Sequence, residues 1–165
     1  MRQACMEKEA FAREEWILRE GLLRTANSIV KNLADAEDAV SQAVLIAWQK
    51  RGQLKDVSRL KPWLFTILVR TCYDMRRKGR RTVLCDDMSA YSLRMSQTGD
   101  DLELWLVLEN LEEKYASLLT LYYYEGFKVD EMARILGISR GTICARLAKG
   151  REILKYQLTE MGDRL

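Results

Sequence analysis

The segment 127–151, FKVDEMARILGISRGTICARLAKGR, constrains this chain most, because it has the pattern of two short helices joined by a tight turn. Apolar residues recur at helical spacing and predict a first helix over about 129–136. Gly137 follows the last apolar residue, at a position where a left-handed C-cap favours a residue without Cβ. Ser139 is a strong N-cap for a second helix, which we expect to continue to the C-terminus.

The start at Ser139 determines which residues of the second helix face the first. Ile143, Leu147 and Gly150 are expected to point inward. The residues expected to point outward or to lie on the flanks are Gly141, Cys144, Ala145, Ala148, Lys149, Arg146 and Arg151. Any compact helical hairpin can have apolar positions and a corner glycine. A small-residue face with basic flanks can also enter a major groove without obstruction, so we predict a DNA-binding helix-turn-helix.

The composition fits a soluble helical protein, with 48% hydrophobic and 31% charged residues and a single proline among 165. The net charge of +3 is modest, so a nucleic-acid surface has to come from local clustering of cations. No apolar run reaches the length of a membrane span, and no signal peptide is evident. We therefore expect a cytoplasmic protein without membrane insertion.

The chain contains no histidine, which removes most general-base, catalytic-triad and zinc chemistry. Four cysteines, Cys5, Cys72, Cys85 and Cys144, have no paired spacing and are expected to be reduced thiols that fill small apolar sites. We accordingly predict no metal, no cofactor and no enzymatic activity.

Three helices are predicted in the first half. The first covers 11–31, with Trp16 in its apolar stripe; Asp35 caps the second, and Ser58 caps the third. The third helix has apolar residues on more than one face and ends in the segment 76–81, RRKGRR, where five of six residues are basic. Such a run is usually a solvated surface. Its position after an aromatic-rich helix favours a nucleic-acid strand, with phosphates on the cations and bases on the rings.

Residues 82–99 are polar and lack a helical period, so we predict a linker that a protease would cut first. It divides the chain into residues 1–81 and 100–165. The predicted fold is all-α, with two small helical domains joined by a flexible linker and a helix-turn-helix in the C-terminal domain.

The two halves together resemble a known family. The segments ADAEDAVSQAVLIAWQKRG and RLKPWLFTILVRTCYDMRRKGRR resemble the second domain of extracytoplasmic-function sigma factors. The segment LEEKYASLLTLYYYEGFKVDEMARILGISRGTICARLAKGREIL resembles their fourth domain, in the expected order and separation. The resemblance implies a protein that binds core RNA polymerase and promoter DNA, and it makes an anti-sigma factor a possible further partner.

The resemblance also implies roles for individual residues. The residues that match the polymerase-docking segment are Asp38, Ser41, Gln42, Leu45 and Trp48. The residues assigned to the minus-ten element are Arg51, Arg59, Lys61, Trp63, Arg70, Tyr73, Arg76, Arg77, Lys78, Arg80 and Arg81. The residues assigned to the minus-thirty-five element are Arg140, Thr142, Cys144, Ala145, Arg146, Ala148 and Lys149.

Some positions depart from the family pattern. Cys144 stands where a basic residue is common, and Arg70 stands where asparagine is common. Lys128 replaces the usual Ser or Thr cap before the first helix of the motif, which is expected to weaken that helix by about 1 kcal/mol.

Two other functions are compatible with a helix-turn-helix. A stand-alone transcriptional regulator would bind duplex DNA specifically without polymerase, but the basic, aromatic helix that ends near Arg81 has no evident role in such a protein. An enzyme acting on nucleic acid would need a carboxylate cluster or an activated nucleophile, and neither is apparent in the sequence.

Overall fold

The computed structural model describes residues 6–79 and 99–163, so nearly all of the predicted linker (82–99) lies outside it. All regular structure in these two ranges is helical, as predicted. The helices are α1 (Lys8–Val30), α2 (Leu33–Gln49), α3 (Leu60–Lys78), α5 (Gly99–Asn110), α6 (Glu113–Leu119), α7 (Val129–Leu136) and α8 (Arg140–Gly162). Three short turns complete the set: η1 (Arg51–Gln53), η2 (Val57–Arg59) and the π-helical η3 (Thr120–Tyr124).

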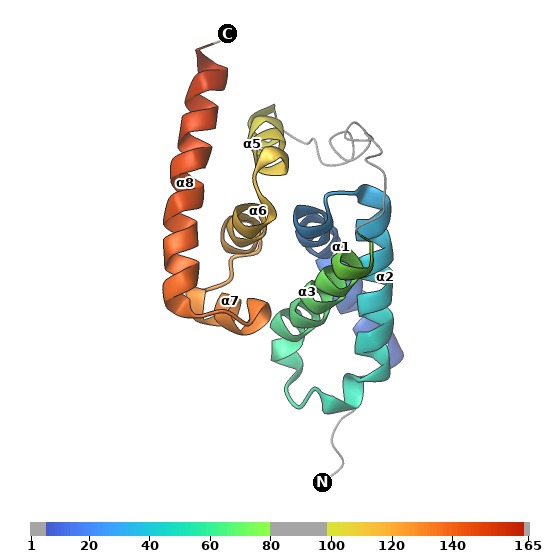
Figure 1. Cartoon of the computed structure of the whole chain (residues 1–165). Coiled ribbons are helices and arrows are strands. Elements are labelled where there is room, and N and C mark those ends of the chain that lie inside the picture. Colours follow the sequence, from blue (N-terminus) through green and yellow to red (C-terminus); the bar gives the residue numbers. More distant parts are fainter. Residues whose placement is uncertain (1–5, 80–98, 164–165) are drawn as a thin grey trace.

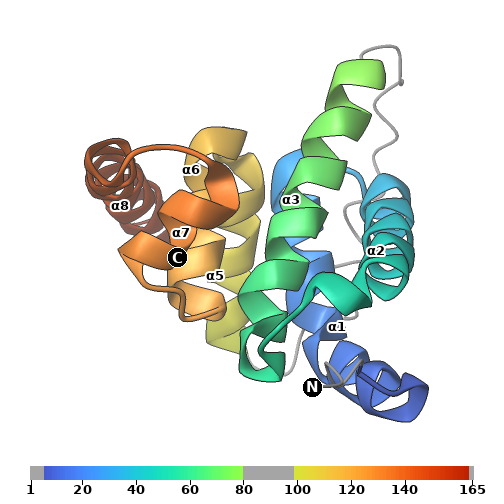
Figure 2. The same ribbon diagram turned by 90° about the horizontal axis from the view of Figure 1, so that it is seen from below.

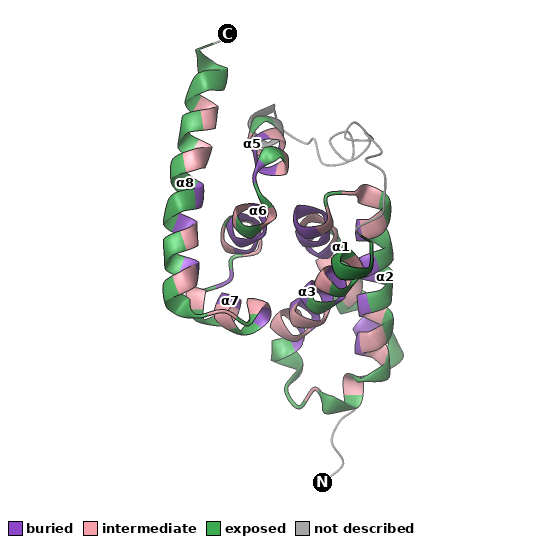
Figure 3. Cartoon of the chain, viewed as in Figure 1, coloured by how far each residue is buried: buried purple, intermediate pink, exposed green. Residues whose placement is uncertain are grey.

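The helices form two groups that lie side by side (Figure 1). Helices α1, α2 and α3 pack into a bundle, and α8 runs along the outer edge of the group formed by α5, α6 and α7. Figure 2 shows α3 on the side of its bundle that faces the C-terminal group, and α1 also packs directly on α6 and η3 of that group. Buried residues line the inner faces of both groups (Figure 3), and the largest of them include Leu22, Phe65, Leu68, Leu121 and Met132.

The apolar face predicted for α1 is wrong near the N-terminal end of the helix, where it includes an exposed residue. Trp16 is 75% exposed and the adjacent Ile17 is 66% exposed. The buried apolar residues are Phe11, Leu22 and others that follow at helical spacing. Much of the buried face of α1 is formed by small or polar residues, so hydrophobicity alone did not identify it.

Two predicted helix caps are also wrong. Asn32 is the N-cap of α2, and its side chain accepts a hydrogen bond of 3.0 Å from the backbone N–H of Asp35. Asp56 precedes η2 and accepts bonds from both the N–H and the hydroxyl of Ser58. Ser58 therefore lies within the turn that leads into α3. In both cases a cap residue two or three positions upstream begins the helical turn earlier.

The cap of α2 can be tested by substitution. We expect Asn32→Ala to lower the free energy of unfolding by about 1 kcal/mol, because it leaves an N–H of the first turn without its acceptor. Asp35→Ala removes only a favourable charge near the helix N-terminus and should cost less, about 0.3–1 kcal/mol. Urea unfolding followed by circular dichroism measures both. A larger destabilisation by Asp35→Ala would restore Asp35 as the cap.

Candidate nucleic-acid interface

The turn between α7 and α8 has the predicted geometry. Gly137 has φ +67°, and its N–H donates to the carbonyl of Ala133 at 2.9 Å. The Ser139 hydroxyl accepts from the N–H of Thr142 at 3.2 Å, which confirms it as the N-cap of α8. A positive φ is inexpensive only for glycine, so this residue fixes the direction in which α8 leaves α7.

The start of α7 is better stabilised than the missing serine or threonine cap suggested. The ammonium group of Lys128 cannot accept a hydrogen bond. The carboxylate of Glu131, however, accepts from the N–H of Lys128 at 2.9 Å. This is half of a capping box, and it places a negative charge in the first turn.

Helix α8 presents the faces that the sequence predicts. Ile143, Leu147 and Gly150 are buried. A Cβ added to Gly150 would lie 3.3 Å from Cδ1 of Leu119, so α8 packs closely on α6 at this residue. Of the predicted outward-facing and flanking residues, Arg146 is half-buried and the following are exposed: Gly141, Cys144, Ala145, Ala148, Lys149 and Arg151.

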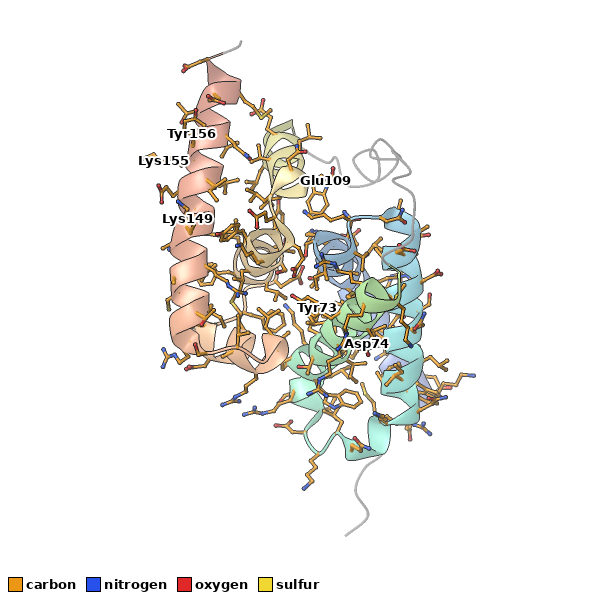
Figure 4. All side chains as sticks on the ribbon, in the orientation of Figure 1. Tyr73, Asp74, Glu109, Lys149, Lys155 and Tyr156 are labelled. Atoms are coloured by element: carbon orange, nitrogen blue, oxygen red, sulfur yellow. The ribbon has the colours of Figure 1, made fainter. Side chains whose placement is uncertain are left out.

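The basic residues around this face take part in surface interactions. Arg140 pairs with Asp130 of α7 at 2.8 Å, and Lys149, labelled in Figure 4, lies 3.7 Å from Glu152. Solvent-exposed pairs of this kind contribute little to stability, so both cations can exchange their partners for phosphate or base atoms at small cost. The half-buried Thr142 lies in the first turn, beside Ser139.

Arg151 has a partner that the sequence did not reveal. Its Nε donates to the hydroxyl of Tyr123 at 2.6 Å, and its guanidinium lies 5.3 Å from the ring centre of Tyr122. Both tyrosines lie in η3, the π-helical segment that follows the end of α6 at Leu119.

Most of the described residues assigned to the minus-ten element fall into two sets on α3. Trp63, Arg70 and Arg77 recur at intervals of seven and share one side of the helix. Arg70 and Arg77 are exposed, Trp63 is half-buried, and Arg77 pairs with Asp74 on the same surface. Arg59 and Lys78 are exposed at the two ends of α3, whereas Arg80 and Arg81 lie outside the described residues.

The second set faces the C-terminal group of helices. The ammonium of Lys61 donates to the carbonyl of Glu125 at 2.7 Å. The Tyr73 hydroxyl donates to the Glu113 carboxylate, which also pairs with Arg76 at 3.0 Å. Figure 4 labels Tyr73 where α3 approaches α6. Burial, followed by the bond to Glu113, raises the pKa of Tyr73 above its usual value, so the hydroxyl remains a donor.

Arg51 and Trp48, which the sequence assigned to two different partners, form a single stack. The Arg51 guanidinium lies 3.7 Å from the centre of the Trp48 ring and donates to the Trp48 carbonyl at 2.7 Å. Phe11 packs on the same indole with a centroid separation of 5.4 Å. The other four residues assigned to polymerase docking, all exposed on the outer side of α2, are Asp38, Ser41, Gln42 and Leu45.

Two family models match the chain in the order of these two groups. Sigma-70 region 2 matches residues 18–82, and sigma-70 region 4 matches residues 101–154. The chain belongs to the sigma-70 family, in its extracytoplasmic-function group. In this sigma factor the region 2 match contains α2 and α3, and the region 4 match contains α6, α7 and most of α8.

Characterised sigma factors are similar over most of their length. SigV of Bacillus subtilis is 29% identical over 144 residues, which cover 86% of this chain and 87% of SigV. The extracytoplasmic-function sigma factor SigL of Mycobacterium tuberculosis is 28% identical over 149 residues, covering 86% of this chain and 84% of SigL.

Solved structures have the same fold. The sigma factor RpoE of Bartonella quintana, in complex with the anti-sigma factor NepR, superposes with a TM-score of 0.71 and 27% identity, over 90% of this chain and 96% of that one. CnrH, in complex with the cytosolic domain of CnrY, gives a TM-score of 0.67 at 23% identity, over 93% of this chain and 90% of that one.

The described part of the sigma factor offers no cluster of three or more side chains suited to a metal ion. Within the same ranges, no helix combines the length and the apolar character needed to cross a bilayer. The two described cysteines differ. Cys72 is buried, and burial raises the pKa of its thiol to about 12, whereas Cys144 is exposed, contrary to the expectation of a small apolar site.

This difference gives a direct probe of the α8 face. In a variant with Cys5→Ser and Cys85→Ser, we expect iodoacetamide to modify Cys144 in the native protein and Cys72 only after unfolding, because alkylation requires an accessible thiolate. Promoter DNA bound with core polymerase should slow the modification of Cys144, as followed by mass spectrometry. Unchanged modification in the DNA complex would mean that this face of α8 does not lie in the groove.

Proposed function

We propose that this sigma factor binds core RNA polymerase and directs it to promoters, where transcription starts. The observation that carries the proposal is the pairing of two surfaces in one chain. One is the exposed face of small residues on α8, and the other is the side of α3 that carries Trp63, Arg70 and Arg77. A helix in the major groove suits duplex DNA, and cations beside an aromatic ring suit a separated strand.

The α8 face is proposed to contact the minus-thirty-five element. Cys144, Ala145 and Ala148 allow close approach but offer few hydrogen bonds, so recognition relies on thymine methyl groups, backbone contacts and DNA shape. Lys149 can reach guanine O6 or N7 from the same face. Arg140, Thr142 and Arg146 lie at its edges, where contacts to phosphate are expected.

The exposed side of α3 is proposed to contact the minus-ten strand, together with Arg59, Lys78 and the segment 80–81. The outer side of α2 is proposed to dock on core polymerase, and Leu45 is 56% exposed there. An exposed leucine among polar residues can bury its side chain on a partner with little loss of solvation.

The chain is proposed to act as two units, 1–81 and 100–165, joined by the segment between them. The polymerase supplies the chemistry, so no catalytic role is assigned to this chain, and its place of action is the cytoplasm. An anti-sigma factor is included among the proposed partners, because RpoE was solved in complex with one.

Run-off transcription tests the function. Core polymerase with this protein should give discrete transcripts from genomic fragments, whereas either component alone should not. The protein alone should bind promoter duplex weakly, because each surface is small and both must engage together. Tight, sequence-specific binding without polymerase would favour the stand-alone regulator.

A pair of variants separates base contacts from phosphate contacts. We expect Lys149→Ala to change which minus-thirty-five sequences are used, since a lysine contact to guanine provides about 1–3 kcal/mol of discrimination. The double variant Arg77→Ala with Lys78→Ala should weaken all promoters alike. Its log–log salt slope should decrease in magnitude by about 0.7 for each single-strand phosphate that the variant no longer neutralises.

Transcription from a library of minus-thirty-five variants, repeated at several salt concentrations, measures both effects. A uniform decrease of activity in Lys149→Ala would reclassify this residue as a phosphate contact. Altered minus-thirty-five preference in the double variant would contradict the assignment of Arg77 and Lys78.

A further inference from the structure

The two groups of helices meet through opposite charges. The Glu125 carboxylate, from the end of η3, lies 3.0 Å from the guanidinium of Arg24 in α1 and 3.9 Å from the ammonium of Lys61 in α3. Only 7% of the Glu125 side chain is exposed. Glu113, at the start of α6, bonds to Tyr73 and Arg76 of α3. Two carboxylates of the C-terminal group thus hold the side chains of the N-terminal group.

A small aromatic contact lies beside the Glu125 pair. The rings of Phe65 and Phe127 pack edge to face with centroids 5.1 Å apart, and the ammonium of Lys61 lies 5.0 Å from the centre of the Phe127 ring. Just after the end of α1, the ammonium of Lys31 donates to the carbonyls of Leu108 and Glu109. Interfaces with this many polar contacts are typical of domains that move relative to one another.

Gly21 of α1 provides the room that the Glu125 carboxylate needs. It is buried in the middle of a 23-residue helix, where glycine is an unfavourable residue. A Cβ built on Gly21 would lie 2.3 Å from Oε2 of Glu125, and the three nearest atoms all belong to that carboxyl group. The glycine therefore leaves the space that the Glu125 carboxylate occupies.

Lys61, Tyr73 and Arg76, which these carboxylates hold, are residues that the family resemblance also assigns to the minus-ten element. We propose that Glu113 and Glu125 hold the free sigma factor in a closed form, in which their carboxylates occupy the positions that promoter phosphates take on the open protein. This inference rests on the proposed function for the identity of the displaced ligand. The contacts of Glu113 and Glu125 with α1 and α3 are observed in the structure and do not depend on that function.

The carboxylates and the promoter phosphates compete because both are anions that bind the same cations. Carboxylates and phosphates both accept charge-assisted hydrogen bonds from lysine and arginine, and a phosphate cannot enter a position that a carboxylate already fills. Burial raises the pKa of Glu125 above its usual value, although Arg24 and Lys61 act in the opposite direction. Once the two groups separate, the Glu125 carboxylate regains water, and the cations become available to DNA.

The closed form has a measurable effect on affinity. When only a fraction of the molecules is competent to bind, the apparent dissociation constant rises by the inverse of that fraction. If about one molecule in ten is open, full opening should tighten binding about tenfold.

Three variants test the closed form. Glu113→Gln with Glu125→Gln removes both charges and keeps the side-chain size. Gly21→Leu leaves every charge in place and forces a side chain into the space of the Glu125 carboxylate. Glu112→Gln is the control for charge, because it removes one negative charge, half of the change in the double variant, from a 72% exposed side chain that lies 3.4 Å from Lys114, in its own group of helices.

Two measurements on the full chain decide the question. Small-angle X-ray scattering reports whether the two groups separate. Fluorescence anisotropy with a labelled DNA strand of random sequence, about 20 nucleotides long and so longer than one single-strand site, reports strand affinity. The double variant should show a larger radius of gyration and about tenfold tighter strand binding. Gly21→Leu should shift both quantities in the same direction, and Glu112→Gln should match the wild type.

Other outcomes overturn the proposal. An unchanged radius of gyration in both the double variant and Gly21→Leu would show that the carboxylates do not hold the closed form. Separation without tighter binding would show that they do not compete with DNA. Equal tightening in Glu112→Gln would show a general effect of charge. Run-off transcription by the wild type with core polymerase tests the proposed function separately, and its absence would leave the scattering result intact.

Discussion

The left-handed backbone at Gly137 determines which side of α8 meets the solvent. Because the chain reverses between Leu136 and Ser139, α8 can pack only with Ile143 and Leu147 against the rest of the group. Every exposed residue on the opposite face follows from that one constraint. The glycine corner therefore connects a backbone dihedral angle to the surface proposed to enter the major groove.

The sequence identified this region well because its signals are local. The corner glycine, the cap and the helical period all lie within a short stretch of chain, and they predicted both the bounds of α7 and the buried residues of α8. The same reasoning placed Trp16 on the wrong face of α1. It failed there because buried residues of α1 include Gly21, Thr25 and Asn27, which carry no hydrophobic signal.

The arrangement of the two groups could not be predicted, because it depends on residues far apart in the chain. Arg24 and Glu125 are 101 positions apart, and Tyr73 and Glu113 are 40 apart. Nothing near either partner indicates the pairing. The basic and aromatic residues of α3 were therefore grouped as one surface, whereas the structure divides them between solvent and the C-terminal group.

That division separates the residues proposed to dock on core polymerase from some of those that the family resemblance assigns to the promoter. Asp38, Ser41, Gln42 and Leu45 remain exposed while the two groups are packed together, whereas Lys61 and Tyr73 do not. The docking of core polymerase proposed for α2 therefore does not require the charged interface to break first. Polymerase shifts the equilibrium toward the open form only to the extent that it binds that form more tightly. If the α2 surface is the same in both forms, such preference must come from contacts made by the C-terminal group after it separates.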